Sequence, residues 1–158
     1  MTKYTDITGY FEALATKYVG HSPTEKRFFR KGLDEFMQSL VIDSQTPVML
    51  LDKYDFRYSD NLADNMFKDR TIAFIIAGRI NDIDDYESMD TVYDDCEEII
   101  DNIVNQIRYD MNPPRHDIMK FSNLNNIQAT PIQNTADGNY GYYVTIDISS
   151  IHSTLLPT

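Results

Sequence analysis

The sequence predicts an α+β domain: a small, mostly antiparallel sheet packed by one long helix, with two further helices at the N-terminal end. Residues 7–40 and 92–107 repeat apolar side chains every three or four positions, as helices do. Residues 54–58 alternate apolar with charged side chains, as strands do, and Asp137-Gly138 is typical of a hairpin turn. We therefore expect the order α-α-β-β-α-β-β.

The composition fits one folded domain. The chain has 158 residues, of which 42% are hydrophobic and 12% aromatic, too many for a disordered acidic chain. The single cysteine cannot form a disulfide within the chain, which is typical of a reducing compartment. We expect residues 1–158 to form a single domain, with residues 1–20 as an added N-terminal helix and residues 149–158 as an extended C-terminal tail.

The first predicted helix covers residues 6–19 and ends at Gly20, a left-handed cap. Its apolar stripe consists of Ile7, Tyr10, Phe11, Leu14 and Tyr18. Ser22, Pro23 and Glu25 then match the N-cap, first and third positions of a second helix, the pattern of a capping box. This second helix would carry a basic patch in its first turns, consisting of Lys26, Arg27, Arg30 and Lys31.

Two strands are predicted next. In the first, Tyr54, Phe56 and Tyr58 alternate with charged residues, so we expect one of its faces to be buried. The second, at residues 70–80, has apolar residues on both sides and is therefore expected in the middle of the sheet. The connection between them is long for a hairpin and contains three apolar residues that need somewhere to bury: Leu62, Met66 and Phe67.

A long helix is predicted up to Asn112-Pro113-Pro114, which stops it. Its apolar stripe consists of Val92, Cys96, Ile99, Ile100, Ile103, Val104 and Ile107. At about 1.5 Å per residue this helix would be about 30 Å long, enough to cross a sheet. Its opposite side is acidic and includes Asp94, Asp95, Glu98 and Asp101. Most of the acidic run at residues 81–98 is therefore interpreted as helix surface.

The last predicted elements are two strands joined at Asp137-Gly138. In the second of them, four apolar side chains face one way: Tyr142, Val144, Ile146 and Ile148. Pro131 lies in the first and predicts an edge position or a bulge there, because proline has no amide hydrogen to donate.

The acidic residues before the long helix do not form a calcium-binding motif. Counted from Asp82, such a loop needs an oxygen ligand in fifth place and a glycine in sixth, where the chain has Tyr86 and Glu87. Asp82, Asp84, Asp85 and Glu87 could still hold a hard cation, but a solvated loop is the favoured interpretation.

Other catalytic or metal-binding patterns are not found. The histidines, His21, His116 and His152, are scattered, and Cys96 lies on an apolar stripe where a buried structural thiol is expected. The sequence contains no glycine-rich phosphate loop. We therefore predict that the protein is not an enzyme and has no cofactor, with paired surface carboxylates as the only remaining catalytic possibility.

The order of elements from about residue 25 to residue 149 resembles the tail-terminator, or tail-completion, family of bacteriophages. The matching segments are two strands with a long connection ("TPVMLLDKYDFRYSDNLADNMFKDRTIAFIIAG"), a long helix ("SMDTVYDDCEEIIDNIVNQIRYD") and a final hairpin ("NIQATPIQNTADGNYGYYVTIDIS"). The resemblance implies a ring-forming virion protein that caps or joins the tail tube, with DNA passing through its lumen. Related folds serve as neck or tail-ring proteins, and the resemblance implies no catalytic residues.

A ring needs two different, complementary patches on each subunit. We expect the basic patch, Lys26, Arg27, Arg30 and Lys31, to meet the acidic face, Asp94, Asp95, Glu98 and Asp101, with Leu62, Met66 and Phe67 contributing apolar contacts. The simpler alternative is that these charges pair within one subunit or face water. The expected partners are therefore further copies of the chain and other virion tail or neck proteins.

The charge balance fits more than one function. The net charge of −11, from 25 acidic and 14 basic residues, disfavours binding to nucleic acid and would let DNA slide through a lumen. It also fits an acidic DNA mimic or immunity-type inhibitor that occupies the basic groove of another protein. No segment is apolar enough to span a membrane, so we expect a cytosolic protein. The resemblance to the phage family implies a virion protein made in the host bacterial cytoplasm.

Overall fold

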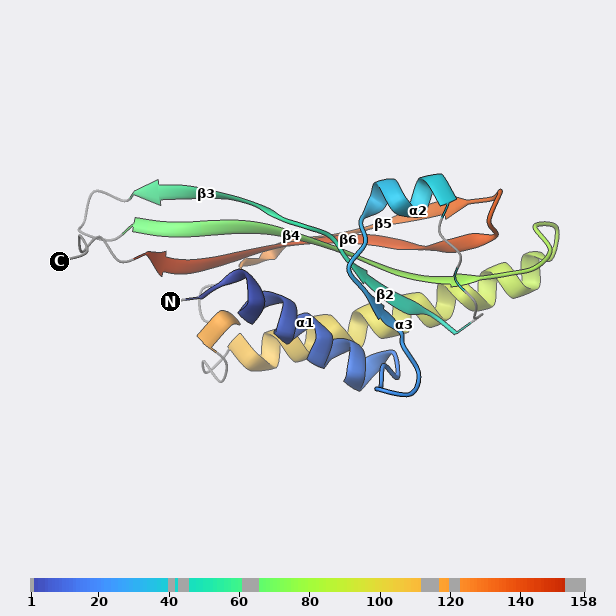
Figure 1. Ribbon diagram of the computed structural model, residues 1–158, viewed down its shortest axis with the longest axis horizontal. Coiled ribbons are helices and arrows are strands. Elements are labelled where there is room, and N and C mark those ends of the chain that lie inside the picture. Colours follow the sequence, from blue (N-terminus) through green and yellow to red (C-terminus); the bar gives the residue numbers. More distant parts are fainter. Residues whose placement is uncertain are drawn as a thin grey trace.

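The computed structural model describes residues 2–39, 42, 46–60, 66–111, 117–119 and 123–152 and has the expected α+β fold (Figure 1). The helices are α1 (Tyr4–Tyr18), α2 (Leu33–Ser39), α3 (Tyr86–Met111) and the short 3-10 helix η1 (Asp117–Met119). The strands are β1 (Phe28–Phe29), β2 (Val48–Leu51), β3 (Asp55–Asp60), β4 (Met66–Arg79), β5 (Asn123–Asn134) and β6 (Asn139–His152). They form one sheet in the order β1-β2-β4-β6-β5, with β3 also beside β4, and only the β1-β2 pair is parallel.

The sheet lies between two layers of helices, with α1 and α3 on one face and α2 on the other (Figure 1). Strand β4 separates two hydrophobic clusters, because its side chains alternate between the faces. Ile72, Phe74 and Ile76 pack into the larger cluster with α1 and α3, whereas Ile75 and Ala77 pack with α2. The prediction of a central strand covered on both sides is therefore confirmed.

Helix α1 is part of the main core. Ile7 and Phe11 are completely buried, and the ring of Phe11 lies 5.4 Å from that of Phe74. Gly20 has a φ of 71°, the left-handed conformation expected just after a helix. The predicted helix and its stripe are thus confirmed, and α1 packs on the sheet as an integral layer.

The second helix does not begin at the predicted capping box. The amide of Glu25 does donate to Ser22 Oγ at 3.0 Å, but the turn that this bond closes is not continued as a helix. Residues 28–29 instead pair with β2, where the amide of Met49 donates to the carbonyl of Arg27 at 2.8 Å, and Phe28 becomes buried. Burial of an aromatic residue in the sheet outweighs one capping bond.

The strand predicted around residues 54–58 is also corrected. The structure has two strands here, β2, which is buried, and β3, which is exposed along its whole length, and residues 52–54 separate them. Phe56 is 51% exposed and Tyr58 is 50% exposed, so the face of β3 that the sequence predicts to be buried is exposed. The connection to β4 is shorter than predicted, since Met66 and Phe67 belong to β4, and Leu62 lies outside the described residues.

Helix α3 confirms the long helix that crosses the sheet. Its 26 residues give a length of about 39 Å. Five residues of the predicted stripe are buried, namely Val92, Cys96, Ile100, Ile103 and Ile107. Ile99 and Val104 are partly buried and pack against the same cluster.

The final hairpin turns at Gly138 as predicted, and β5 is an edge strand that includes Pro131. Strand β6 is longer than expected. Residues 149–152, which were predicted to belong to a C-terminal tail, pair with residues 66–69 of β4, because the register of the ladder continues without a break from Arg79↔Asn139 to Met66↔His152. Residues 153–158 lie outside the described residues.

We expect a Gly138→Ala substitution to lower the free energy of unfolding by more than about 1 kcal/mol. Gly138 has a φ of 71°, and a Cβ there would come 2.3 Å from the carbonyl oxygen of Ile80. The matched control is Gly9→Ala on the exposed side of α1, where a Cβ would meet nothing within 4 Å and should stabilise the helix by about 0.5–1 kcal/mol. Urea unfolding of both variants checks this, and equal effects would contradict the predicted backbone strain.

Candidate functional site

The predicted basic patch lies around the edge strand β1. Arg27 pairs with Glu25 and donates from Nη1 to the carbonyl of Thr46 at 3.5 Å. Arg30 lies over the ring of Tyr4, 5.1 Å from its centroid, and donates to the Tyr4 hydroxyl at 2.6 Å. The arginines of the patch are therefore already held by their own chain, and Lys26 lies over the ring of Phe29, 5.0 Å from its centroid. Lys31 is exposed.

The predicted acidic face of α3 is exposed to solvent at all four positions, Asp94, Asp95, Glu98 and Asp101. Within the described ranges, no ion pair joins these carboxylates to the basic patch. Asp95 and Thr46 nevertheless line the same hollow of about 360 Å³, and Thr46 is the residue that Arg27 contacts. Part of the basic patch thus lies near part of the acidic face within one subunit.

Strands β3, β4 and β6 continue beyond the helices as an arm, made of residues 55–60, 66–71 and 147–152. Figure 1 shows them running on past the N-terminal end of α1. Phe56 pairs with Arg70, and Tyr58 with Lys68, so these side chains share one face of the arm. It is the face that, further along β4, packs on α1 and α3 through Ile72 and the residues after it.

Two aromatic rings and a cation form the centre of this face. The rings of Phe56 and Tyr58 meet edge to face at 5.8 Å, and Lys68 Nζ lies 3.8 Å from the centroid of Phe56 and 5.9 Å from that of Tyr58. The ring of His152 lies 5.0 Å from that of Tyr58. Partial loss of water lowers the pKa of Lys68, and the charge of Arg70 lowers it further.

The aromatic face continues from the arm toward the basic patch. The ring of Tyr54 lies 5.2 Å from that of Tyr4, on which Arg30 stacks. We call the whole surface the cation-aromatic band; it consists of Arg30, Tyr4, Tyr54, Phe56, Lys68, Tyr58 and His152. The sequence did not predict this band, because the alternation of Tyr54, Phe56 and Tyr58 with charged residues indicates a buried face.

The other face of the arm is polar at its base, whereas Phe67 and Ile151, which is 50% exposed, pair with each other nearer its tip. Asp69 accepts hydrogen bonds from Ser59 Oγ at 2.7 Å and from Ser149 Oγ at 2.6 Å, across both neighbouring strands. Burial raises the pKa of Asp69, but the hydrogen bonds from Ser149 and Ser59 outweigh this effect and lower it overall. Thr71 donates to Asp147 at 3.1 Å on the same face. These bonds join the three strands of the arm.

Arg70 fastens the arm to the rest of the domain. Its side chain is almost completely buried at 1% exposure, and it donates to Ser150 Oγ at 2.8 Å and to the carbonyl of Thr2 at 2.9 Å. Burial raises the pKa of Tyr54, while a hydrogen bond from Arg70 opposes the increase. The base of the arm, the segment before α1 and β6 therefore meet at one guanidinium group.

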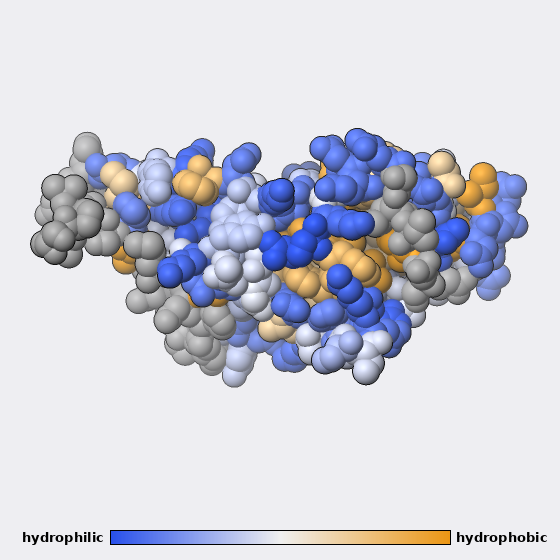
Figure 2. Space-filling view, viewed as in Figure 1, coloured by the Kyte–Doolittle hydropathy of each residue, from blue (hydrophilic) through white to orange (hydrophobic). Residues whose placement is uncertain are grey.

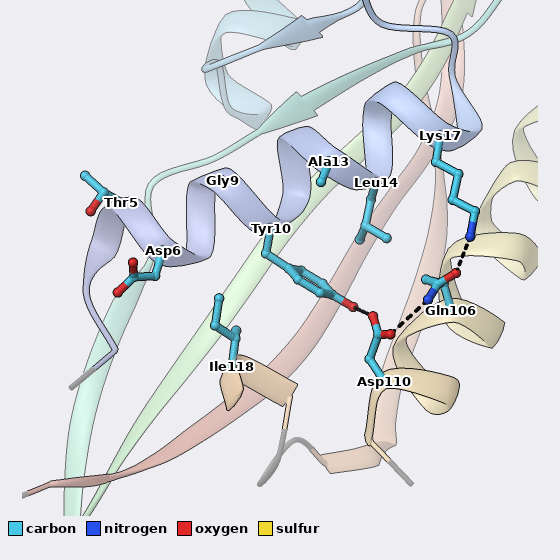
Figure 3. A pocket seen from close by; sticks show the side chains of 10 residues that line it. All are labelled: Thr5, Asp6, Gly9, Tyr10, Ala13, Leu14, Lys17, Gln106, Asp110 and Ile118. Carbon is cyan, nitrogen blue, oxygen red and sulfur yellow. Dashed lines mark hydrogen bonds between the residues drawn. The ribbon is translucent and has the colours of Figure 1, made fainter. Parts of the chain in front are cut away.

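A groove of about 520 Å³ lies between α1 and α3 (Figure 3). Its polar side chains bind one another. Tyr10 donates to Asp110 at 2.6 Å, Gln106 donates to the other oxygen of Asp110 at 2.9 Å, and Lys17 donates to Gln106 at 2.7 Å. Burial raises the pKa of Tyr10 strongly, and Asp110 adds to the shift. These hydrogen bonds hold the two helices together, and they already occupy the polar groups of Tyr10, Lys17, Gln106 and Asp110.

The acidic turn, residues 82–87, lies at the end of the molecule opposite the arm (Figure 1). Asp85 caps α3, accepting from the amide of Ser88 at 3.0 Å and from its hydroxyl at 2.7 Å, and the bond from this hydroxyl is the main cause of the lowered pKa of Asp85. Asp82 accepts from the amide of Asp84 at 2.9 Å. Ile83 and Tyr86 are 49% and 67% exposed, so two large apolar side chains stand among the carboxylates.

Two hypotheses about reactive or metal-binding groups can be compared with the structure. Cys96 is completely buried, and desolvation raises its pKa to about 12, which confirms the expected structural thiol. In the described part of the chain, no cluster of three or more acidic, histidine or cysteine side chains is placed to hold a metal ion.

The described helices include none that is long and apolar enough to cross a membrane.

Comparison of the chain with models of known protein families and with curated proteins yields no match.

We expect Arg70→Met to lower the free energy of unfolding by about 2 kcal/mol or more, because it leaves Ser150 Oγ and the Thr2 carbonyl without their buried donor. Lys68→Met, two residues away on the same face but only partly buried, should cost less than about 1 kcal/mol. Thermal unfolding measures both changes. Amide hydrogen exchange in the arm should be faster in Arg70→Met and unchanged in Lys68→Met. This result would show that the lost stability is that of the arm.

The burial of Cys96 predicts that iodoacetamide leaves the native protein unmodified at pH 8, since the thiolate needed for alkylation is not formed there. Denaturation in urea should expose the thiol and allow complete modification. Mass spectrometry of both samples checks this. Rapid modification without denaturant would show that the thiol is accessible.

Proposed function

We propose that this chain is a ring-forming structural subunit of a bacteriophage tail or head-to-tail neck, which caps or joins the tail tube around the DNA channel. The observation that carries the proposal is the arm, a three-stranded extension whose aromatic face is half exposed. Phe56 and Tyr58 are held in place by a cation and a neighbouring ring, but half of their surface still faces solvent. Exposed apolar surface of this kind is typical of a protein interface.

The distribution of charge favours contact between unlike ends of identical subunits. The cation-aromatic band gathers positive groups in a chain of net charge −11, and the acidic turn with the adjoining face of α3 gathers negative ones. A contact between two different patches generates a closed ring or an open filament, whereas a contact of one patch with itself stops at a dimer. A ring is therefore the assembly that this arrangement favours.

The acidic character also fits the lumen of a tail. DNA must move through such a channel without adhering, and a protein needs clustered cations to hold phosphates. The cations of the band lie among aromatic rings, where they stack on Tyr4 and Phe56. We therefore infer that the band contacts protein, and that DNA passes without sequence-specific binding.

A second candidate is an acidic inhibitor that occupies a basic groove of another protein. The observation that favours it is the exposed row of carboxylates on α3, which could imitate a row of phosphates. An inhibitor of this kind works as a monomer or dimer and gains nothing from an exposed aromatic arm. The arm therefore favours the ring over the inhibitor.

The oligomeric state tests the proposed function. Light scattering across a range of protein concentrations should show masses that climb from 18.3 kDa toward a multiple of several subunits. High salt should lower the mass at a given concentration, because the complementary ends are charged. A constant monomer mass at all concentrations and salt levels would contradict the ring and favour the inhibitor.

A further inference from the structure

The two ends of the subunit are complementary in charge, and both carry exposed apolar side chains. Strand β4 connects them, beginning at Met66 in the arm and ending at Arg79 just before the acidic turn, so they are about 45 Å apart along this strand. Figure 2 shows hydrophobic side chains scattered among hydrophilic ones over the arm, and others at the opposite end, over the turn before α3. One subunit cannot bring these two ends together.

We propose that the acidic turn of one copy docks on the aromatic face of the arm of the next copy, with Ile83 and Tyr86 against Phe56 and Tyr58. This inference rests on the proposed ring and names the contact that builds it. Asp82 and Asp84, both exposed, flank the apolar pair and meet the ammonium group of Lys68. The partner is thus a second copy of this chain.

The exposed apolar side chains support this pairing. Eight large hydrophobic residues are exposed in the described ranges, and the two ends hold Phe56 and Tyr58 on the arm face and Ile83 and Tyr86 on the turn. A turn before a helix could be built from polar residues alone. Two exposed apolar side chains among carboxylates therefore indicate a surface that binds a partner. A basic partner would suit the acids but would not use the aromatic face of the arm, whereas another copy of the chain uses both.

The size of the contact predicts how assembly behaves. Large side chains bury about 150–250 Å² each, so four that are half exposed at the start would remove roughly 300–500 Å² from water. A stable interface buries about 1,600 Å² in total. The contact is therefore weak between two isolated copies and must be extended by the rest of the cation-aromatic band and by α3. Ring closure strengthens it further, because each subunit is then held at both ends.

Cysteine cross-linking tests the contact directly. In a double variant, Tyr58→Cys with Ile83→Cys, a short bismaleimide should join successive copies and give a ladder of multimers on a denaturing gel. Mixing the two single variants should give one cross-linked dimer. The wild-type chain is the first control because Cys96 is buried, and Met37→Cys, at a 51% exposed position on α2, replaces Ile83→Cys as the second.

The outcomes separate the contact from the proposed function. Cross-linking of Tyr58→Cys with Ile83→Cys, and not with Met37→Cys, supports the contact. Oligomers in light scattering without this specific cross-link would overturn the contact and leave the ring intact. A monomer in light scattering, with no cross-link, would overturn both.

A charge exchange provides a second measurement that does not depend on cysteine. Lys68→Glu should weaken association at least about tenfold, since it places like charges against each other, and Asp84→Lys should do the same. The double variant should recover most of the wild-type association. Circular dichroism confirms that each variant is folded, and the absence of recovery in the double variant would contradict the pairing of these two ends.

Discussion

The pairing of β4 with β6 is the interaction on which the rest of the structure depends. It is continuous over 14 residues of each strand, from Met66↔His152 to Arg79↔Asn139. The part nearest Arg79 and Asn139 forms the central sheet, and α1, α2 and α3 pack on it through the alternate side chains of β4. The remaining part has no helix over it in Figure 1 and becomes the arm. One ladder therefore builds both the core and the surface proposed for assembly.

The boundary between core and arm lies at Arg70. On one side of it Ile72 is completely buried, and on the other Lys68 is only partly buried. A buried guanidinium group costs free energy unless it is well hydrogen-bonded, and here it binds β6 and the segment that leads into α1. This arrangement fixes the direction of the arm relative to the helices. A rigid arm loses little conformational entropy when it contacts a partner, which favours assembly.

The elements that the sequence predicted correctly are those whose pattern is long. Helix α3 repeats its apolar residues over several turns, and Asp137-Gly138 needs a backbone conformation that few other residues adopt. The errors came from short patterns. The Ser22 and Glu25 pair closes a single turn equally well with or without a following helix, and alternation at Phe56 and Tyr58 cannot tell whether anything covers the face. The arm was missed because Ser149 to His152 pair with residues about 80 positions earlier in the chain.

The same limit applies to the candidate site. The acidic face of α3 follows from helical spacing alone, whereas the cation-aromatic band joins residues from five separate segments and exists only in the folded chain. Electron microscopy of the purified protein at the concentration where its mass is highest tests the central claim most directly. Closed rings in which elongated subunits touch end to end are the predicted result. Two-fold symmetric dimers, or single subunits only, would contradict a head-to-tail assembly.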